Sequence, residues 1–297
     1  KDLQEGLPLL SDQKYTVPRY HFTKAAANAF AARFYLFKRD YQKAVDHANQ
    51  VFTASNVTTL LRPWNTTYLT YTYREVWAEY AKARQPANLL LAETPSWWGR
   101  YYYSVRYGMT SAIRDEIFAS NVTGGPWAFR NHTYTAGTNN YMIPKINEYF
   151  VRNSVNASIG TGYIMVPLFT VEEVLFNKAE ANNALNNTND VLTDLNSYAA
   201  TRIVSYNAGT HRITETKIKN FYNTSDLQKG ILQTILDFKR AEYVQEGMRW
   251  FDILRHKIVV THRTVEGEVI VLGQDDLRRI LQIPESAELS GVNQNPR

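Results

Sequence analysis

Alanine recurs at helical spacing in two separate stretches of this 297-residue chain, and this pattern restricts the possible folds more than any other feature. Residues 23–38 predict one helix, capped by Thr23 and apolar along one face. The residues of that face recur every three or four positions: Ala26, Ala29, Phe30, Phe34 and Phe37. After a corner at Arg39 and Asp40, residues 41–52 predict a second helix. Small residues let helix backbones approach closely, so residues 23–53 are expected to form a tetratricopeptide-like hairpin.

The same pattern returns in residues 171–203, which predict a second hairpin with its corner at 186–190. A third long helix is expected over 227–247 and a short one over 249–256, so that terminal helices span 227–256. In a helical repeat, each hairpin needs a neighbour to cover its apolar face. The sequence therefore predicts a mainly α fold in which these elements stack on one another.

Residues 56–162 interrupt the helical pattern, apart from a helical stretch at 74–82. This insertion is rich in Trp, Tyr, Gly, Pro and Asn, and a long irregular segment in a compact fold is usually functional. The tail, 261–297, predicts a small β-hairpin that turns at Gly267, and we expect strand residues mainly at 261–272. The predicted architecture is therefore tetratricopeptide-like hairpins packed against an irregular, loop-rich half with a small β-hairpin.

Composition and missing motifs exclude several classes of protein. The chain has no cysteine, so it cannot form a disulfide, a thiolate zinc site or a cysteine nucleophile. Its formal charge of +5 is scattered along the chain, so we expect no nucleic-acid partner. No two histidines have the spacing of a helical zinc site, and no nucleotide-binding glycine motif occurs, so we predict no metal and no cofactor. No apolar run is long enough to span a bilayer.

Three segments carry a resemblance to a known family. The first is ILDFKRAEYVQEGMRWFDILRHK at 235–257, the second is PLFTVEEVLFNKAEANN at 167–183, and the third is LQIPESAELSGVNQNPR at the C-terminus. Their order and spacing are similar to those of the SusD/RagB-like family of outer-membrane nutrient-binding lipoproteins. Members of that family look longer at the N-terminus, so we interpret residues 1–297 as the C-terminal part of a single SusD/RagB-like domain.

The resemblance implies a non-catalytic protein that captures an oligomeric nutrient, most often a glycan, at the bacterial outer membrane. It would work with a SusC-like TonB-dependent transporter that imports the ligand. It would be a cell-surface lipoprotein whose signal and anchoring cysteine lie outside this chain. The absent N-terminal segment is an expected partner of the apolar helix faces. A peptide-binding relative on the same fold, a glycan-degrading enzyme and a helical-repeat scaffold remain alternatives.

The acidic residues near the third helix are compatible with either catalysis or structure. Glu242 and Glu246 are four residues apart, and paired carboxylates can act as general acid and base. Beside Trp250, however, Arg249, Asp252 and Arg255 alternate in charge at three-residue spacing, which is typical of paired charges along a helix face. We therefore interpret all six residues as a structural motif and predict no catalytic residue.

Candidate ligand contacts lie in the insertion. Sugar rings present apolar C–H faces that stack on indole and phenol rings, while their hydroxyls need polar partners. Side chains of both kinds gather in sequence that lacks helical spacing: Trp97, Trp98, Arg100, Tyr101, Tyr107, Trp127 and Asn131. Some of these rings are expected to fill a small core beneath the loops, and two or three of the aromatic residues to face the ligand.

Overall fold

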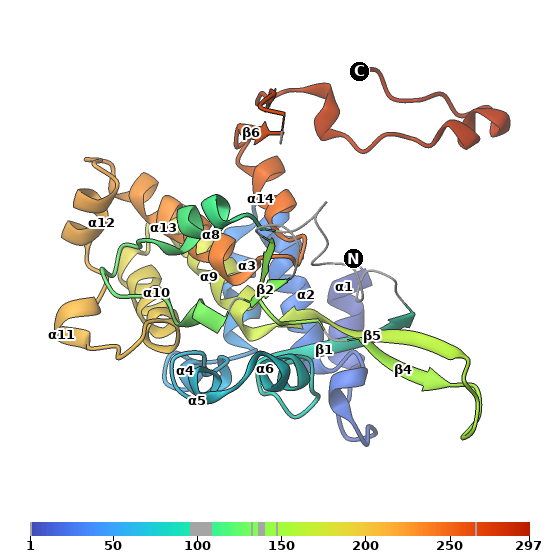
Figure 1. The fold of residues 1–297 in the computed structure, drawn as a ribbon. Helices are drawn as coiled ribbons and strands as arrows, with labels where there is room; N and C mark the ends of the chain where they lie inside the picture. Colours follow the sequence, from blue (N-terminus) through green and yellow to red (C-terminus); the bar gives the residue numbers. More distant parts are fainter. Residues whose placement is uncertain (1, 96–108, 132, 136–139, 147, 265) are drawn as a thin grey trace. The chain divides into compact units, whose positions relative to one another are not determined.

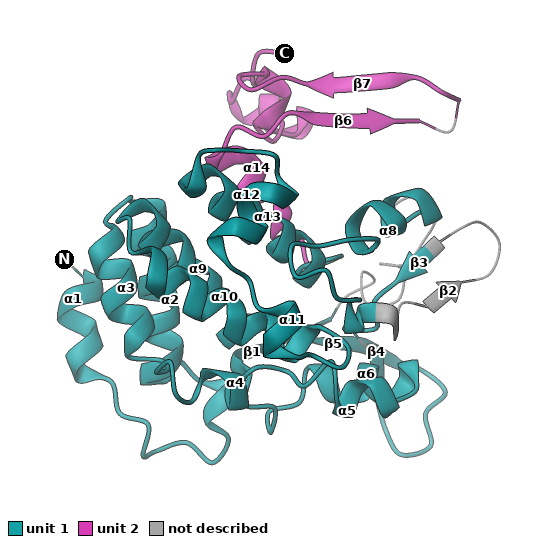
Figure 2. Ribbon diagram, turned by 90° about the vertical axis from the view of Figure 1, so that its left-hand side faces the viewer, with its two compact units in different colours: residues 1–245 teal, residues 246–297 magenta. Residues whose placement is uncertain are grey.

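The computed structural model describes residues 2–95, 109–131, 133–135, 140–146, 148–264 and 266–297. These residues form two compact units, Lys1–Gln245 and Glu246–Arg297, each treated separately below (Figures 1 and 2). The fold is mainly α with small antiparallel sheets, which confirms the predicted fold class. No helix in the described ranges has the length and apolar character needed to cross a membrane.

Both predicted helical hairpins are present in the first unit. After α1 (Asp2–Gly6) and two 3₁₀ turns, η1 (Leu7–Leu9) and η2 (Pro18–Tyr20), the first hairpin consists of α2 (Lys24–Phe37) and α3 (Tyr41–Asn49). Thr23 caps α2 by accepting a hydrogen bond from the Ala26 backbone, as predicted. The second hairpin consists of α9 (Val171–Ala184) and α10 (Thr188–Arg202). Figure 2 shows the four helices stacked side by side.

The apolar face predicted for α2 is divided between the core and the surface. Ala26 and Ala29 of that face and Leu36 are buried, and α2 packs on both α3 and α9. Phe30, Phe34 and Phe37 are instead about 40% exposed. The close packing that alanine permits is thus on a different side of the helix from the phenylalanine rings.

Helix α9 is the centre of the first unit. Its residues from Val171 to Asn183 are all buried, and it contacts α2, α3, α10 and α13 (Leu227–Glu242). Helices α8 (Ser111–Phe118) and α12 (Glu215–Phe221) pack on α13, and α11 (Ala208–His211) precedes α12. The prediction that the third helix continues to residue 247 is wrong. It ends at Glu242, and Gln245 has a left-handed backbone (φ 66°) that cannot continue a helix.

Most strand residues lie within the insertion or in β5, which continues past its end at 162, so the prediction that they lie mainly at 261–272 is wrong. Strand β5 (Gly160–Thr170) pairs with β1 (Asn88–Pro95) and β4 (Glu148–Arg152) in an antiparallel sheet of order β1-β5-β4. A short ribbon, β2 (Thr133–Thr135) and β3 (Asn140–Met142), lies between α8 and β4 in sequence. The insertion also contains α4 (Val57–Leu60), α5 (Thr67–Thr70) and α6 (Tyr73–Tyr80). Aromatic and polar residues obscured the alternating pattern of the strands.

Four fully buried charged residues connect the elements of the first unit. Glu172 on α9 accepts hydrogen bonds from Arg62 (2.9 Å) and from Arg202 at the end of α10 (3.0 Å). Arg202 also donates to Glu242 at the end of α13 (2.8 Å), where the Tyr198 hydroxyl adds a further bond (2.8 Å). The four charged side chains are at most 1% exposed. We name Arg62, Glu172, Arg202 and Glu242 the buried charge network.

The second unit contains α14 (Arg249–Arg255), β6 (Val260–Arg263) and β7 (Val269–Leu272), followed by the turns η4 (Leu277–Arg279) and η5 (Glu285–Ser290). Strands β6 and β7 form the predicted hairpin, and Gly267 in their turn has φ 88°. The Arg279 guanidinium donates to backbone carbonyls of Ile253, Ile258, Leu272 and Gly273. One side chain therefore ties α14, the residues after it and the hairpin together.

Candidate ligand-binding site

An open groove of about 660 Å³ runs along β1 in the first unit. Its volume lies within the range of small-molecule sites, roughly 300–1,000 Å³. Residues of β1, β4 and β5 line the groove together with Tyr20 of η2. We name it the β1 groove, and its lining residues are Tyr20, Leu90, Leu91, Ala92, Glu93, Tyr149, Met165 and Leu168.

Strand pairing explains why Glu93, Tyr149 and Met165 share one face of the sheet. Glu93 lies opposite Met165, and Tyr149 lies opposite Tyr163, two positions from Met165 along β5. Ile164 and Val166 alternate with them and point to the other face, where they pack on a small core that contains Met142, Ile146 and Trp77. The sheet therefore buries one face and leaves the other to form the groove.

Glu93 and Tyr149 form the polar centre of the groove. The Tyr149 hydroxyl donates a hydrogen bond to Glu93 Oε2, and the Tyr149 ring stacks on Tyr163 with centroids 6.1 Å apart. Burial and the neighbouring Glu93 carboxylate raise the pKa of the Tyr149 phenol, which keeps it protonated as a donor. The carboxylate can accept further hydrogen bonds from ligand hydroxyls, while Tyr20 and Leu168 offer exposed apolar surface.

Most of the ligand contacts that we predicted from the sequence lie outside the described residues: Trp97, Trp98, Arg100, Tyr101 and Tyr107. Asn131 ends η3 (Ala128–Asn131), and its side chain is not described. Trp127 is only 6% exposed, and its ring packs edge-on against Phe238 with centroids 5.2 Å apart. The structure thus places the Trp127 ring among core aromatic residues. The sequence predicted this position for some of the rings.

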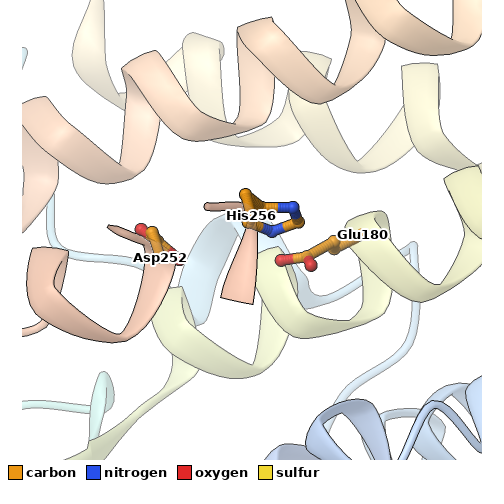
Figure 3. Close-up of side chains that lie close together, drawn as sticks. All are labelled: Glu180, Asp252 and His256. Atoms are coloured by element: carbon orange, nitrogen blue, oxygen red, sulfur yellow. The ribbon is translucent and has the colours of Figure 1, made fainter. Parts of the chain in front are cut away.

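The acidic motif is divided between the two units. Glu242 belongs to the buried charge network, where the charge and hydrogen bonds of Arg202 outweigh burial and lower its pKa. A carboxylate so placed has no access to a substrate. Glu246, Trp250 and Arg255 belong to the second unit, in which Arg249 lies 3.9 Å from Asp252 on α14. Figure 3 draws Asp252 and His256 of this segment together with Glu180, which lies on α9 of the first unit.

The groove residues were missed in the sequence because they come from four separate segments, η2, β1, β4 and β5. Tyr20 is the last residue of the 3₁₀ turn η2. Glu93 lies in β1, and Tyr149 lies in β4. No local spacing connects them. The signal that the sequence does offer is the short apolar run at 89–92, which is typical of a buried strand and comes just before the aromatic-rich residues that start at 97.

The sequence identifies the family. Residues 41–279 match the profile of the SusD family, and residues 1–36 match a second profile described as "Starch-binding associating with outer membrane". The first match covers most of the chain. The chain therefore belongs to the SusD family, which confirms the resemblance found in its motifs.

Solved structures share the fold. A putative sugar-binding protein from Bacteroides vulgatus superimposes with a TM-score of 0.67 at 18% identity, covering 99% of this chain and 63% of that one. A SusD superfamily protein from Bacteroides thetaiotaomicron gives 0.59 at 17% identity, covering 100% and 64%. A laminarin-binding SusD-like protein gives 0.51 at 16% identity, covering 86% and 59%.

This chain thus spans a little over three fifths of the length of the first two of these proteins. No curated protein is similar enough to count as a match.

Proposed function

We propose that this chain captures an oligosaccharide in the β1 groove and does not cleave it. The observation that carries the proposal is the Glu93–Tyr149 pair, set among apolar and aromatic side chains in an open groove. Such a surface offers rings to the C–H faces of a sugar and a carboxylate to its hydroxyls. A family relative whose fold is similar is described as laminarin-binding, which supports a glycan as the ligand.

The aromatic-rich segment extends this proposal. Strand β1 ends at Pro95, and Trp97, Trp98, Arg100, Tyr101 and Tyr107 follow within twelve residues in the sequence. We propose these side chains as additional ligand contacts.

The cellular role follows from the family. We propose that the protein is a lipoprotein at the outer surface of a bacterial outer membrane and delivers its ligand to a SusC-like TonB-dependent transporter. A non-catalytic binder suits that role because an intact oligosaccharide is the cargo. The description of the profile that matches residues 1–36 supports the membrane location.

Calorimetric titration of laminarin, starch and peptide oligomers into the chain tests the proposed function. We expect a glycan to bind with micromolar or weaker affinity, because ordering a flexible oligomer costs entropy. Replacing Glu93 by Gln, or Tyr149 by Ala, is expected to weaken binding at least about tenfold, equivalent to roughly 1.4 kcal/mol. Chromatography of the glycan after long incubation should show no new reducing ends.

Glu148→Gln is the matched control, because Glu148 is adjacent to Tyr149 in β4 but lies opposite Ile164 on the other face of the sheet. It should bind as the unmodified chain does. Because Glu93 is exposed, Glu93→Gln should leave the melting temperature almost unchanged. Binding of peptides alone, or unchanged glycan affinity in both groove variants, would reject the proposed function, and so would cleavage of the glycan.

A further inference from the structure

A second cleft, of about 550 Å³, lies in the first unit, apart from the β1 groove. The loop at 121–124 forms one side, and residues of α11 and α12 form the other. Its polar lining includes Thr123, Thr210, His211 and Lys217, and Phe221 closes one end. We name it the Lys217 cleft. It shares no residue with the β1 groove.

Lys217 holds a positive charge at a fixed position in this cleft. Its Nζ donates one hydrogen bond to the Thr123 carbonyl (3.0 Å) and another to the Thr210 carbonyl. A protonated lysine has three N–H donors, so the two backbone contacts leave one for a ligand. Because carbonyl groups on both sides of the cleft hold the ammonium group, the Lys217 side chain loses little conformational entropy when a ligand binds.

His211 adds a second donor. Its Nδ1 accepts a hydrogen bond from the Asn207 backbone N–H (3.1 Å), so the neutral ring carries its proton on Nε2. That edge of the ring lies toward Gly125: a Cβ added to Gly125 would lie 3.2 Å from Nε2. A side chain at position 125 would therefore crowd this edge of the His211 ring, which the glycine avoids.

Lys217 is the one formally charged side chain in the described lining of the cleft. The described lining contains no carboxylate, and Asn121 is occupied within the loop, where its side chain bonds to Gly125 and Thr123. The segment 206–222 carries Arg212, Lys217 and Lys219 against a single acid, Glu215. Ligands that bring a negative charge are thus favoured over neutral ones.

Phe221 makes the cleft suited to a sugar as well as to an anion. Its side chain is 42% exposed, and Tyr222 holds the ring edge-on with centroids 4.9 Å apart. A ring beside fixed cationic and hydroxyl donors can hold a pyranose by its apolar face while the donors bind its charged substituent.

We propose that the Lys217 cleft binds the acidic substituent of a sugar, a carboxylate or a sulfate ester, so that the protein favours acidic glycans. The inference rests on the proposed function, because it specifies the class of glycan. Lys217 and His211 bind the oxygens of the anion, the exposed Thr210 binds a neighbouring hydroxyl, and Phe221 packs on the sugar ring.

Titration with three oligosaccharides of equal length tests the inference: an oligogalacturonate, a neutral galactan and a sulfated galactan. At low salt, at least one acidic oligomer should bind about tenfold or more tighter than the neutral one, and added salt should remove most of the difference. The acidic oligomer that binds with the higher affinity identifies the preferred substituent as carboxylate or sulfate. Equal affinities for all three oligomers would overturn the inference.

Two variants on one helix locate the effect. Lys217→Gln should abolish the preference for the acidic oligomer, whereas Lys219→Gln removes the same charge outside the cleft lining and should retain the preference. If both variants lose the preference for the acidic oligomer equally, the preference comes from general attraction by the basic surface, and the proposed site is rejected. If Lys217→Gln is unstable, Asn220→Asp serves instead, because this exposed residue lines the cleft and the substitution adds a repelling charge.

The two proposals fail in different ways. If the neutral galactan or another neutral glycan binds and responds to Glu93→Gln, the proposed function stands whatever the acidic oligomers do. If neutral glycans bind in this way and acidic ones bind no tighter, only the inference about the Lys217 cleft is rejected.

Discussion

Glu172→Ala is expected to lower the free energy of unfolding by about 3–5 kcal/mol, the range typical of removing one partner from a buried ion pair. Glu172 bridges Arg62 and Arg202, and all three side chains are fully buried. Arg202 would keep Glu242, but Arg62 would lose its only charged partner among the described residues. Its guanidinium would be left with the Asn88 side chain, a distant backbone carbonyl and the face of the Tyr80 ring, whose centroid lies 3.9 Å away.

Urea denaturation followed by circular dichroism measures this change. Asp40→Ala is the control, because it breaks the Asp40–Lys43 pair, which is exposed, and should leave the unfolding midpoint almost unchanged. Replacing Arg62 and Glu172 together by methionine should restore part of the lost stability, since no charge then remains unpaired at that end of the network. A Glu172→Ala protein as stable as Asp40→Ala would show that the network does not hold the first unit together.

Asp194 is expected to make stability depend on pH in the opposite direction from most acidic residues. Burial raises the pKa of this carboxyl to about 6, although Lys178 lies 3.2 Å away. Oδ2 is buried and has no hydrogen-bond partner in the described part of the chain. The folded protein thus binds the proton more tightly than the unfolded chain, in which an aspartate titrates near 3.8. This stabilisation is complete below about pH 4 and is lost as the pH rises through about 6.

The difference in unfolding free energy between the unmodified chain and Asp194→Asn isolates this effect. Asparagine keeps an oxygen acceptor for Lys178, and all other groups titrate alike in both proteins. Between pH 4 and pH 7.5 the difference should change by about 3 kcal/mol, with the unmodified chain losing stability relative to the variant as the pH rises. A difference independent of pH would show that Asp194 keeps an ordinary pKa.

Local sequence patterns predicted most helices of this fold. Thr23 at the cap, the alanines of the first hairpin and the corner at 186–190 each act within a few residues, so their effect is visible in the sequence. The turn at Gly267 is of the same kind. Helices α11 and α12 are short and carry no long apolar period, and they were not predicted.

The buried charge network could be predicted only in part. Glu242 stood out in the sequence because it belongs to a charge-rich motif, but its partners could not be found there. Arg202 is 40 residues away, and Glu172 lies 110 residues from Arg62. Partners at such distances become neighbours only when the hairpins stack.

The candidate site, too, could be predicted from the sequence only in part. The aromatic-rich sequence predicted ligand contacts in the insertion, but Trp127 lies in the core, where its ring packs against Phe238 on α13. Glu93 and Tyr149 are 56 residues apart and meet because β1 and β4 both pair with β5. Sheet register, which no short motif encodes here, places them in one groove.

A crystal structure of the chain with a glycan that binds in calorimetry tests the central claim most directly. We expect an intact oligosaccharide in the β1 groove, with a ring face against Tyr149 or Tyr20 and a hydroxyl donating to the Glu93 carboxylate. A glycan bound only elsewhere on the chain would contradict the claim, as would cleaved products in the groove.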